Sequence, residues 1–209
     1  MKVFSLSLML ILMVFSGRSA ALDVSEPVQA DNQEITAEVR AMLEARDREI
    51  KDLLGPEGTE YSPEKRQELM DIINEVIDYR AMAQHALQDK WNELSEEERD
   101  EFVDVFAQVV RDQSLNSLDI YRAEVTYEEF KVENDRVTAR TVARLDNVRT
   151  PVIYEMEKEG DEWVVKDMSV DNVSTANSYQ RSFQRILQRR GYEALLGNLK
   201  RRAGVSDDA

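Results

Sequence analysis

The hydrophobic period of this chain changes from helical to alternating near residue 125, and that change limits the folds available to the chain more than any other feature. Before it, apolar side chains recur at helical spacing, as in the series from Leu69 to Val76. After it they alternate, with Val137, Ala139 and Thr141 on one face of an extended segment. A helical period returns from about Thr175. Helices, then strands, then a helix indicate an α+β domain.

Four helices are expected before the change of period. Each has a start signal, because a side-chain oxygen stands where it can accept a backbone N–H of the first turn. These start signals lie at Asp31, Ser62, Asp78 and Ser95. Gly55-Pro56 is expected to end the first helix, while the segment after Asp78 is expected to be one short helix reaching Trp91. The fourth helix is expected to extend to Leu118.

Four strands are expected over residues 124–132, 136–145, 149–158 and 162–171. Short turn-like segments such as Glu159-Gly160-Asp161 separate them, which predicts an antiparallel meander. A last helix is expected from Thr175, with a break at Gly191. We therefore predict helices packed on a curved four-stranded, mainly antiparallel sheet, an NTF2-like cone that encloses an apolar cavity.

Composition excludes several chemistries. The 209 residues include no Cys and one His, His85, so thiolate catalysis, Cys-ligated metals and His clusters are excluded. The formal net charge is −15, which argues against general nucleic-acid binding. We expect no metal and no cofactor.

Residues 1–21 are typical of a cleaved secretory signal peptide. Lys2 precedes an apolar run from Val3 to Phe15 that is short for a membrane span, and small residues at Ser19 and Ala21 place the cut before Leu22. An exported chain without Cys fits the bacterial periplasm. We expect a polar lead-in over residues 22–34, one domain over 35–202 and a flexible tail over 203–209.

Three blocks of residues carry a resemblance to a known family. They are Asp78–Ala83 with Leu87 and Trp91, then Pro151–Tyr154 with Trp163–Met168, and then Asn172–Ser174 with Tyr179, Phe183, Ile186 and Gly191. In order and spacing they resemble the MlaC family, the periplasmic phospholipid-binding components of the Mla, or toluene tolerance, pathway. The sequence departs from the family pattern at Gln88, Ser114 and Asn172, where glycine, an aromatic residue and glycine are usual, respectively.

The resemblance implies a phospholipid shuttle and no enzyme. It implies a protein that carries glycerophospholipid between an outer-membrane lipoprotein complex and an inner-membrane ABC transporter with an MCE-domain ring, and so maintains outer-membrane lipid asymmetry. We expect it to be a monomer. Such a ligand needs apolar, adaptable walls. For each candidate the alternative is plain core, and the resemblance favours the lining. The candidates for this lipid cavity are Val76, Ile77, Met82, Phe106, Val109, Val110, Leu115, Leu118, Val142, Ile153, Met168, Val170 and Val173.

The last helix carries most of the local positive charge. Residues 175–202 contain seven basic side chains and one acid, and Arg181, Arg185 and Arg189 recur every four residues on one helix face. One interpretation is a solvated face with cations near a helix C-terminus. The other is that these three arginines contact an acidic partner or the lipid headgroup.

An alternative function is a binding module or an NTF2-like enzyme for another small apolar ligand. A cone with a pocket suits small isomerases and dehydratases, in which a His or Asp acts as general base. Here the candidates are His85 and the pair Tyr79 and Asp167. Surface or structural roles remain open for all three.

Overall fold

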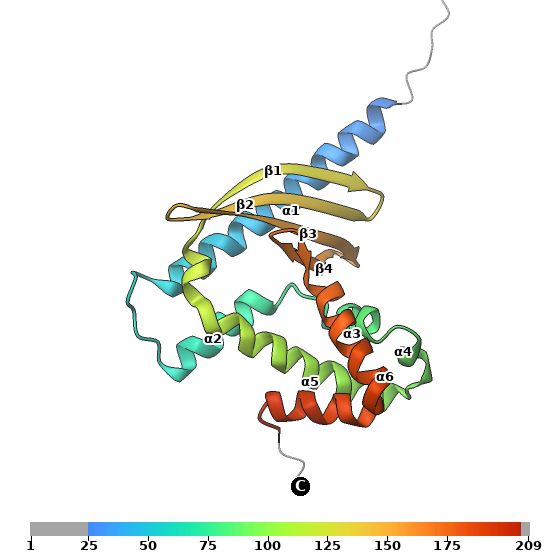
Figure 1. Ribbon diagram of the computed structural model, residues 1–209. Helices are drawn as coiled ribbons and strands as arrows, with labels where there is room; N and C mark the ends of the chain where they lie inside the picture. The colour runs from blue at the N-terminus through green and yellow to red at the C-terminus, as the bar shows by residue number, and fades with distance from the viewer. Residues whose placement is uncertain (1–24, 206–209) are drawn as a thin grey trace, which may run out of the picture.

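The computed structural model describes residues 25–205, with the backbone alone for residues 25–30 and 116–117 (Figure 1). Residues 1–21, the expected signal peptide, lie outside this range. The helices in the described range are α1 (Ser25–Leu54), α2 (Pro63–Asn74), α3 (Tyr79–Leu87), α4 (Asp89–Glu93), α5 (Glu96–Ser114), the 3-10 helix η1 (Leu115–Arg122) and α6 (Thr175–Arg202). The strands are β1 (Glu124–Glu133), β2 (Arg136–Leu145), β3 (Val148–Glu159), β4 (Glu162–Val170) and β5 (Val173–Ser174).

The five strands form one antiparallel sheet in the order β1-β2-β3-β4-β5. The α+β class, the four expected strands and the meander are confirmed. The sequence did not predict β5, which is only two residues long and pairs with Ser169 and Val170. Its turn uses Asn172 at φ 61°, a left-handed conformation that Asn tolerates, which explains why glycine is usual at this position.

Three of the four expected helix starts are confirmed. The side chains of Ser62, Asp78 and Ser95 accept the N–H of Lys65, Ala81 and Glu98 respectively, and Ser95 with Glu98 forms a full capping box. The start at Asp31 is wrong, because α1 already begins at Ser25 and most of the expected polar lead-in is helical. The segment is rich in polar residues, as loops are, but Pro27 suits the first turn of a helix.

Two other helix predictions need correction. The helix expected from Asp78 to Trp91 is divided at Gln88, whose φ is 53°, into α3 and α4. The fourth helix ends at Ser114, so Leu118 lies on η1. The break at Gly191 is confirmed, since this residue has φ 80° within α6.

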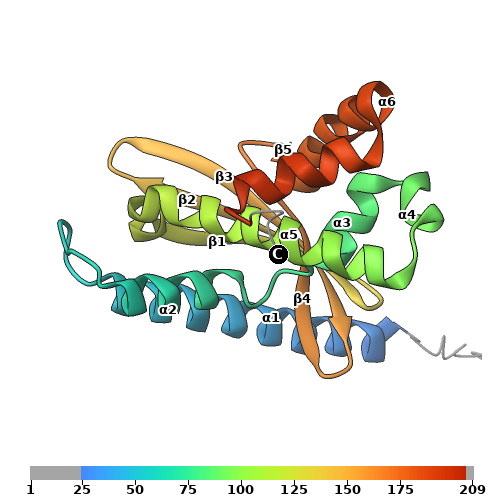
Figure 2. The same ribbon diagram turned by 90° about the horizontal axis from the view of Figure 1, so that it is seen from below.

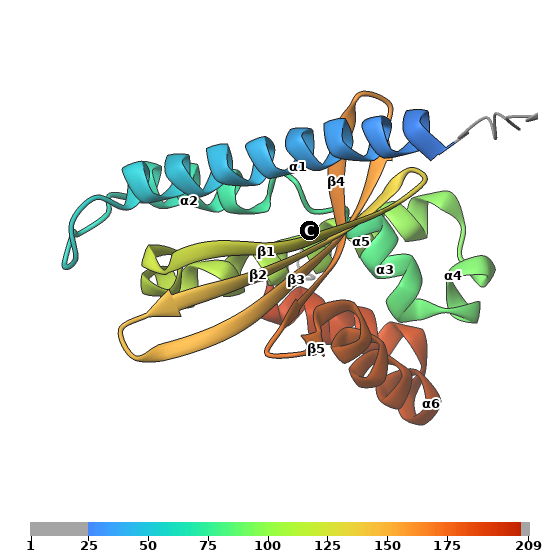
Figure 3. The same cartoon turned by 90° about the horizontal axis from the view of Figure 1, so that it is seen from above.

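The helices flank the twisted sheet on two sides. Seen from above and from below, α1 runs along one side and α6 along the opposite side (Figures 2 and 3). The connection between α2 and α3 also joins the edge of β4, because Ile77 forms a parallel bridge with Val165. No helix within residues 25–205 has the length and apolarity to cross a membrane.

Candidate functional site

The interior between the sheet and the helices is divided into three apolar clusters. The first joins α3, α5 and α6 around Phe102, Phe106 and Phe183, which are almost fully buried. The Phe183 ring meets Phe102 edge-on at 5.8 Å and Phe106 at 5.6 Å. Such edge contacts contribute about 0.5–1.5 kcal/mol each beyond burial, so they hold α5 against α6.

The other two clusters lie along α1. In the second cluster Val39 and Leu43 pack on strand residues, including Val137 and Met156. The third cluster joins α1 to α2 and η1 around Ile50, Leu54, Leu69 and Ile72. Helix α1 therefore contributes to two of the three clusters and connects them.

The structure places nine of the thirteen predicted lining residues in these clusters. Met82, Phe106 and Val109 are buried in the first cluster, and Ile77 and Val110 lie half-buried against it. The second cluster is bordered by Val76 and Met168, and the third by Leu115 and Leu118. They come from all three clusters, so they do not form one continuous wall.

The other four predicted lining residues lie elsewhere. Ile153 and Val170 are half-buried strand residues, whereas Val173 is 54% exposed. Val142 is buried, but it lies among charged side chains on the sheet face opposite α1. The lining role of these four residues therefore stays a prediction.

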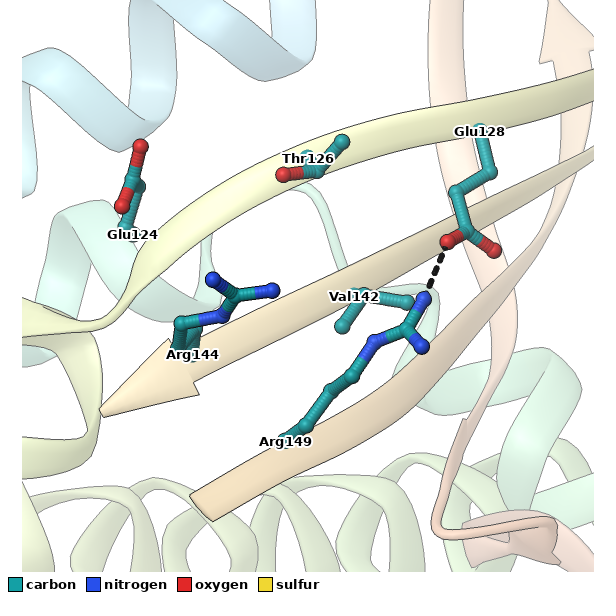
Figure 4. A pocket seen from close by; sticks show the side chains of 6 residues that line it. All are labelled: Glu124, Thr126, Glu128, Val142, Arg144 and Arg149. Atoms are coloured by element: carbon teal, nitrogen blue, oxygen red, sulfur yellow. Dashed lines mark hydrogen bonds and ion pairs between the residues drawn. The ribbon is translucent and has the colours of Figure 1, made fainter. Parts of the chain in front are cut away.

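The depression that contains Val142 has the wrong size and chemistry for a lipid. It has a volume of about 130 Å³, and Figure 4 shows Val142 between Arg144, Arg149 and residues of β1. Two of its lining residues, Arg149 and Glu128, form an ion pair of 2.6 Å (Figure 4). Ligand pockets are commonly about 300–1,000 Å³ and mostly apolar, so this depression is a surface feature of the sheet.

The sequence pattern assigned no site role to the half-buried Tyr121, Tyr127, Tyr154 and Tyr179, whereas the buried Tyr79 was a candidate. Burial raises the pKa of Tyr79, Tyr121 and Tyr154 to about 12, and it also raises the pKa of Tyr127 and Tyr179. The five phenols come from five different elements, and Tyr121, Tyr127, Tyr154 and Tyr179 border the apolar clusters. The available signal was their position on the apolar faces, for example Tyr179 four residues before Phe183.

The residues named for an enzyme have structural contacts. His85 is exposed, and its Nε2 lies 2.8 Å from Oδ1 of Asn177 on the surface. The Asp167 carboxylate accepts hydrogen bonds from the N–H of Met168 and Ala176 and from the Ser174 hydroxyl, and so it fixes the start of α6. No group of three His, Asp or Glu side chains in the described range is arranged to hold a metal ion.

The three arginines of the predicted contact site lie on the exposed side of α6. Arg181, Arg185 and Arg189 are all exposed, and Arg181 donates to the Ser178 hydroxyl at 3.1 Å. Among the described residues none of the three forms an ion pair with a carboxylate. They therefore present uncompensated positive charge, which both interpretations of this face allow.

These features define the molecule as an α+β protein whose antiparallel sheet is flanked by helices that enclose separate apolar clusters. A sequence profile described as MlaC protein matches residues 44–201. The chain belongs to the MlaC family. A search of curated proteins gave no significant match.

Among solved structures, the chain is similar in fold to the phospholipid-binding protein from Ralstonia solanacearum, determined in complex with a phospholipid. The TM-score is 0.68 at 22% sequence identity, and the match covers 80% of this chain and 96% of that one. The shared fold covers nearly the whole of that protein.

Proposed function

We propose that this protein binds a glycerophospholipid between the sheet and the helices and carries it through the periplasm. The observation that carries the proposal is family membership over residues 44–201, together with a fold shared with a protein solved in complex with a phospholipid. In this account the ligand passes between an outer-membrane lipoprotein complex and an inner-membrane ABC transporter complex with an MCE-domain ring. The protein would perform no covalent chemistry.

Half-buried apolar residues at the borders of the three clusters support this function physically. Two acyl chains hold roughly thirty methylenes, each worth about 0.8 kcal/mol on leaving water, so a carrier must offer them an extended apolar surface. Half-buried residues at the cluster borders, such as Ile77, Val110 and Leu118, can supply that surface if the clusters move apart. Met168 can adapt to varied chains through its flexible thioether.

The expected export signal supports the location. Residues 1–21 have the charge and apolar run of a signal peptide, and a carrier between two membranes of a cell envelope must work in the periplasm. We propose that the exported protein acts as a monomer.

The arginines of α6 provide a surface for the partners. Arg181, Arg185 and Arg189 are exposed on one helix that also contributes Phe183 to the first cluster. We propose that they contact acidic surfaces of the transport complexes or the lipid headgroup, because opposite charges raise the rate of encounter between proteins.

Transfer between vesicles tests the shuttle function. Donor vesicles carry a fluorescent phospholipid with a quencher, and acceptor vesicles carry neither. The protein without residues 1–21 should extract the fluorescent lipid into a soluble complex and increase its transfer. The absence of both extraction and transfer would contradict the proposal.

A further inference from the structure

Arg111 differs from the other half-buried cations of the described residues, because it has no carboxylate partner. Ten other lysines and arginines of similar exposure each have a carboxylate oxygen within 4.0 Å. These ten are Arg40, Arg46, Lys51, Lys65, Lys90, Arg99, Arg122, Lys158, Lys166 and Lys200. The remaining unpaired arginines are exposed, so water solvates them.

The Arg111 guanidinium faces the protein interior. It lies over the Tyr79 ring, with its central carbon 5.3 Å from the ring centroid. Its Nε is buried and has no hydrogen-bond partner among the described residues. A buried donor without a partner costs about 1–3 kcal/mol, and more when the group is charged.

The groups around Arg111 are neutral. Burial raises the pKa of the Tyr79 phenol to about 12, and the nearby Tyr121 and Tyr179 act in the same direction, although a hydrogen bond with Arg111 and the charge of Arg111 lower it. The phenols therefore stay protonated near neutral pH and supply no negative charge. Ser114 donates to the Arg111 carbonyl oxygen at 2.6 Å and accepts from Asn74 at 3.0 Å, so this side of the site is also neutral.

Arg111 stands between two of the apolar clusters. Its neighbour Val110 packs against the first cluster, and Leu115, one turn further along the chain, borders the third. Arginine presents a planar set of donors that matches two oxygens of a phosphate. In a protein with a net charge of −15, an interior cation without an acid is a position where an anion from outside can be held.

We propose that Arg111 binds the phosphate group of the ligand and so positions a phospholipid with its chains against the first and third clusters. This inference rests on the proposed function and adds a specific phosphate contact to it. The same chemistry would hold inorganic phosphate, but the adjoining apolar clusters favour the phosphodiester of a lipid.

The test compares two lipids with identical chains. The two lipids are dioleoyl phosphatidylglycerol and dioleoylglycerol. Each is offered separately, in micelles that contain no phosphatidylcholine, to the wild type, to Arg111→Gln and to Arg111→Lys. Arg48→Gln is the control, because Arg48 is an exposed arginine on α1 without a carboxylate partner. Thermal unfolding confirms that each variant is folded. If Arg111→Gln does not fold, Arg111→Lys, which keeps the positive charge, still allows the comparison.

Arg111→Gln should bind phosphatidylglycerol about tenfold more weakly while its affinity for dioleoylglycerol is unchanged. Arg111→Lys should retain part of the preference, and Arg48→Gln all of it. Unchanged discrimination in both Arg111 variants would overturn the inference. A titration with inorganic phosphate provides a second way to overturn it. If phosphate stabilises the wild type but neither Arg111 variant, while all three proteins distinguish the two lipids equally, the site holds free phosphate and not a lipid. A wild type that binds neither lipid would instead contradict the proposed function.

Discussion

Tyr79 on α3 donates a hydrogen bond of 2.7 Å to Oδ1 of Asn74, the last residue of α2. The Asn74 side chain is 1% exposed, and its Nδ2 donates to the Met70 carbonyl at 2.6 Å and to Ser114 at 3.0 Å. One buried amide therefore joins α2, α3 and the end of α5. These contacts fix the position of the Tyr79 ring, over which the Arg111 guanidinium lies.

Tyr79→Phe should lower the free energy of unfolding by about 1–3 kcal/mol, because it leaves Oδ1 of Asn74 buried without a donor. Urea unfolding followed by circular dichroism measures the change. Tyr179→Phe is the matched control, since the Tyr179 hydroxyl donates at 2.7 Å to Gln113, which is exposed and can turn to water. Equal losses in the two variants would contradict the role given to Asn74.

The contact between Asp78 and Lys166 predicts a loss of stability in acid. Burial acts to raise the pKa of Asp78, but the hydrogen bond from Lys166 and that from the Ala81 N–H lower it below 3.8 overall. A carboxylate with a lowered folded pKa stabilises the protein above its unfolded pKa. This contribution is lost as the pH falls through the folded value.

Asp78→Asn should therefore destabilise the protein by about 1 kcal/mol at pH 7 and by much less at pH 3, since Asn keeps the helix cap and removes only the charge. The free energy of unfolding in urea at the two pH values provides the measurement. Asp52→Asn, at an exposed position on α1, should show no such pH dependence. A destabilisation of the same size at both pH values would rule out the charge as its cause.

Most of the fold could be predicted because its signals are local. The three caps at Ser62, Asp78 and Ser95 and the alternation in β2 need only neighbouring residues, and they gave element limits close to those observed. The division at Gln88 has no signal in the residue itself, since a residue other than glycine rarely adopts a φ of 53°; the available signal was that glycine is usual at this position in the family. The early start of α1 was hidden because polar residues in its first turns look like those of a loop.

The site was less predictable because it depends on contacts between distant elements. Hydrophobicity alone selected Val142 and Val173 along with Val110, although only the last lies against an interior cluster. Arg111 was overlooked because a charge beside two valines on a helix looks like part of a solvated face. The absence of a carboxylate beside Arg111 depends on how α3 and α5 pack together, which the sequence does not reveal.

Reversal of the α6 arginines tests the partner contact. The triple variant Arg181→Glu, Arg185→Glu and Arg189→Glu should slow lipid exchange with the partner complexes at low salt, by about tenfold or more, while the retained lipid is unchanged. The control reverses three other exposed arginines without carboxylate partners, namely Arg48, Arg66 and Arg144. Exchange rates that remain equal to the wild type at low salt, or that fall equally in the control, would exclude a specific role for α6.

Substitutions of two valines on α5 test whether a residue lines the lipid site or only belongs to the core. Val110 and Val103 are both half-buried against the first cluster, but only Val110 belongs to the predicted lining. Val110→Phe should reduce the amount of retained lipid by filling the space for a chain, whereas Val103→Phe should retain it. Each change should cost no more than about 1–3 kcal/mol in stability. Equal lipid content in the two purified variants would remove Val110 from the lining.

The central claim is that this interior holds a phospholipid, and the direct test is to measure what the purified protein carries. The full chain is expressed with its own residues 1–21 in a Gram-negative host and purified without detergent, and its organic extract is analysed by mass spectrometry and by phosphorus assay. The account predicts about one glycerophospholipid for each protein molecule. An extract without phospholipid, from folded protein that also takes up none from vesicles, would contradict it.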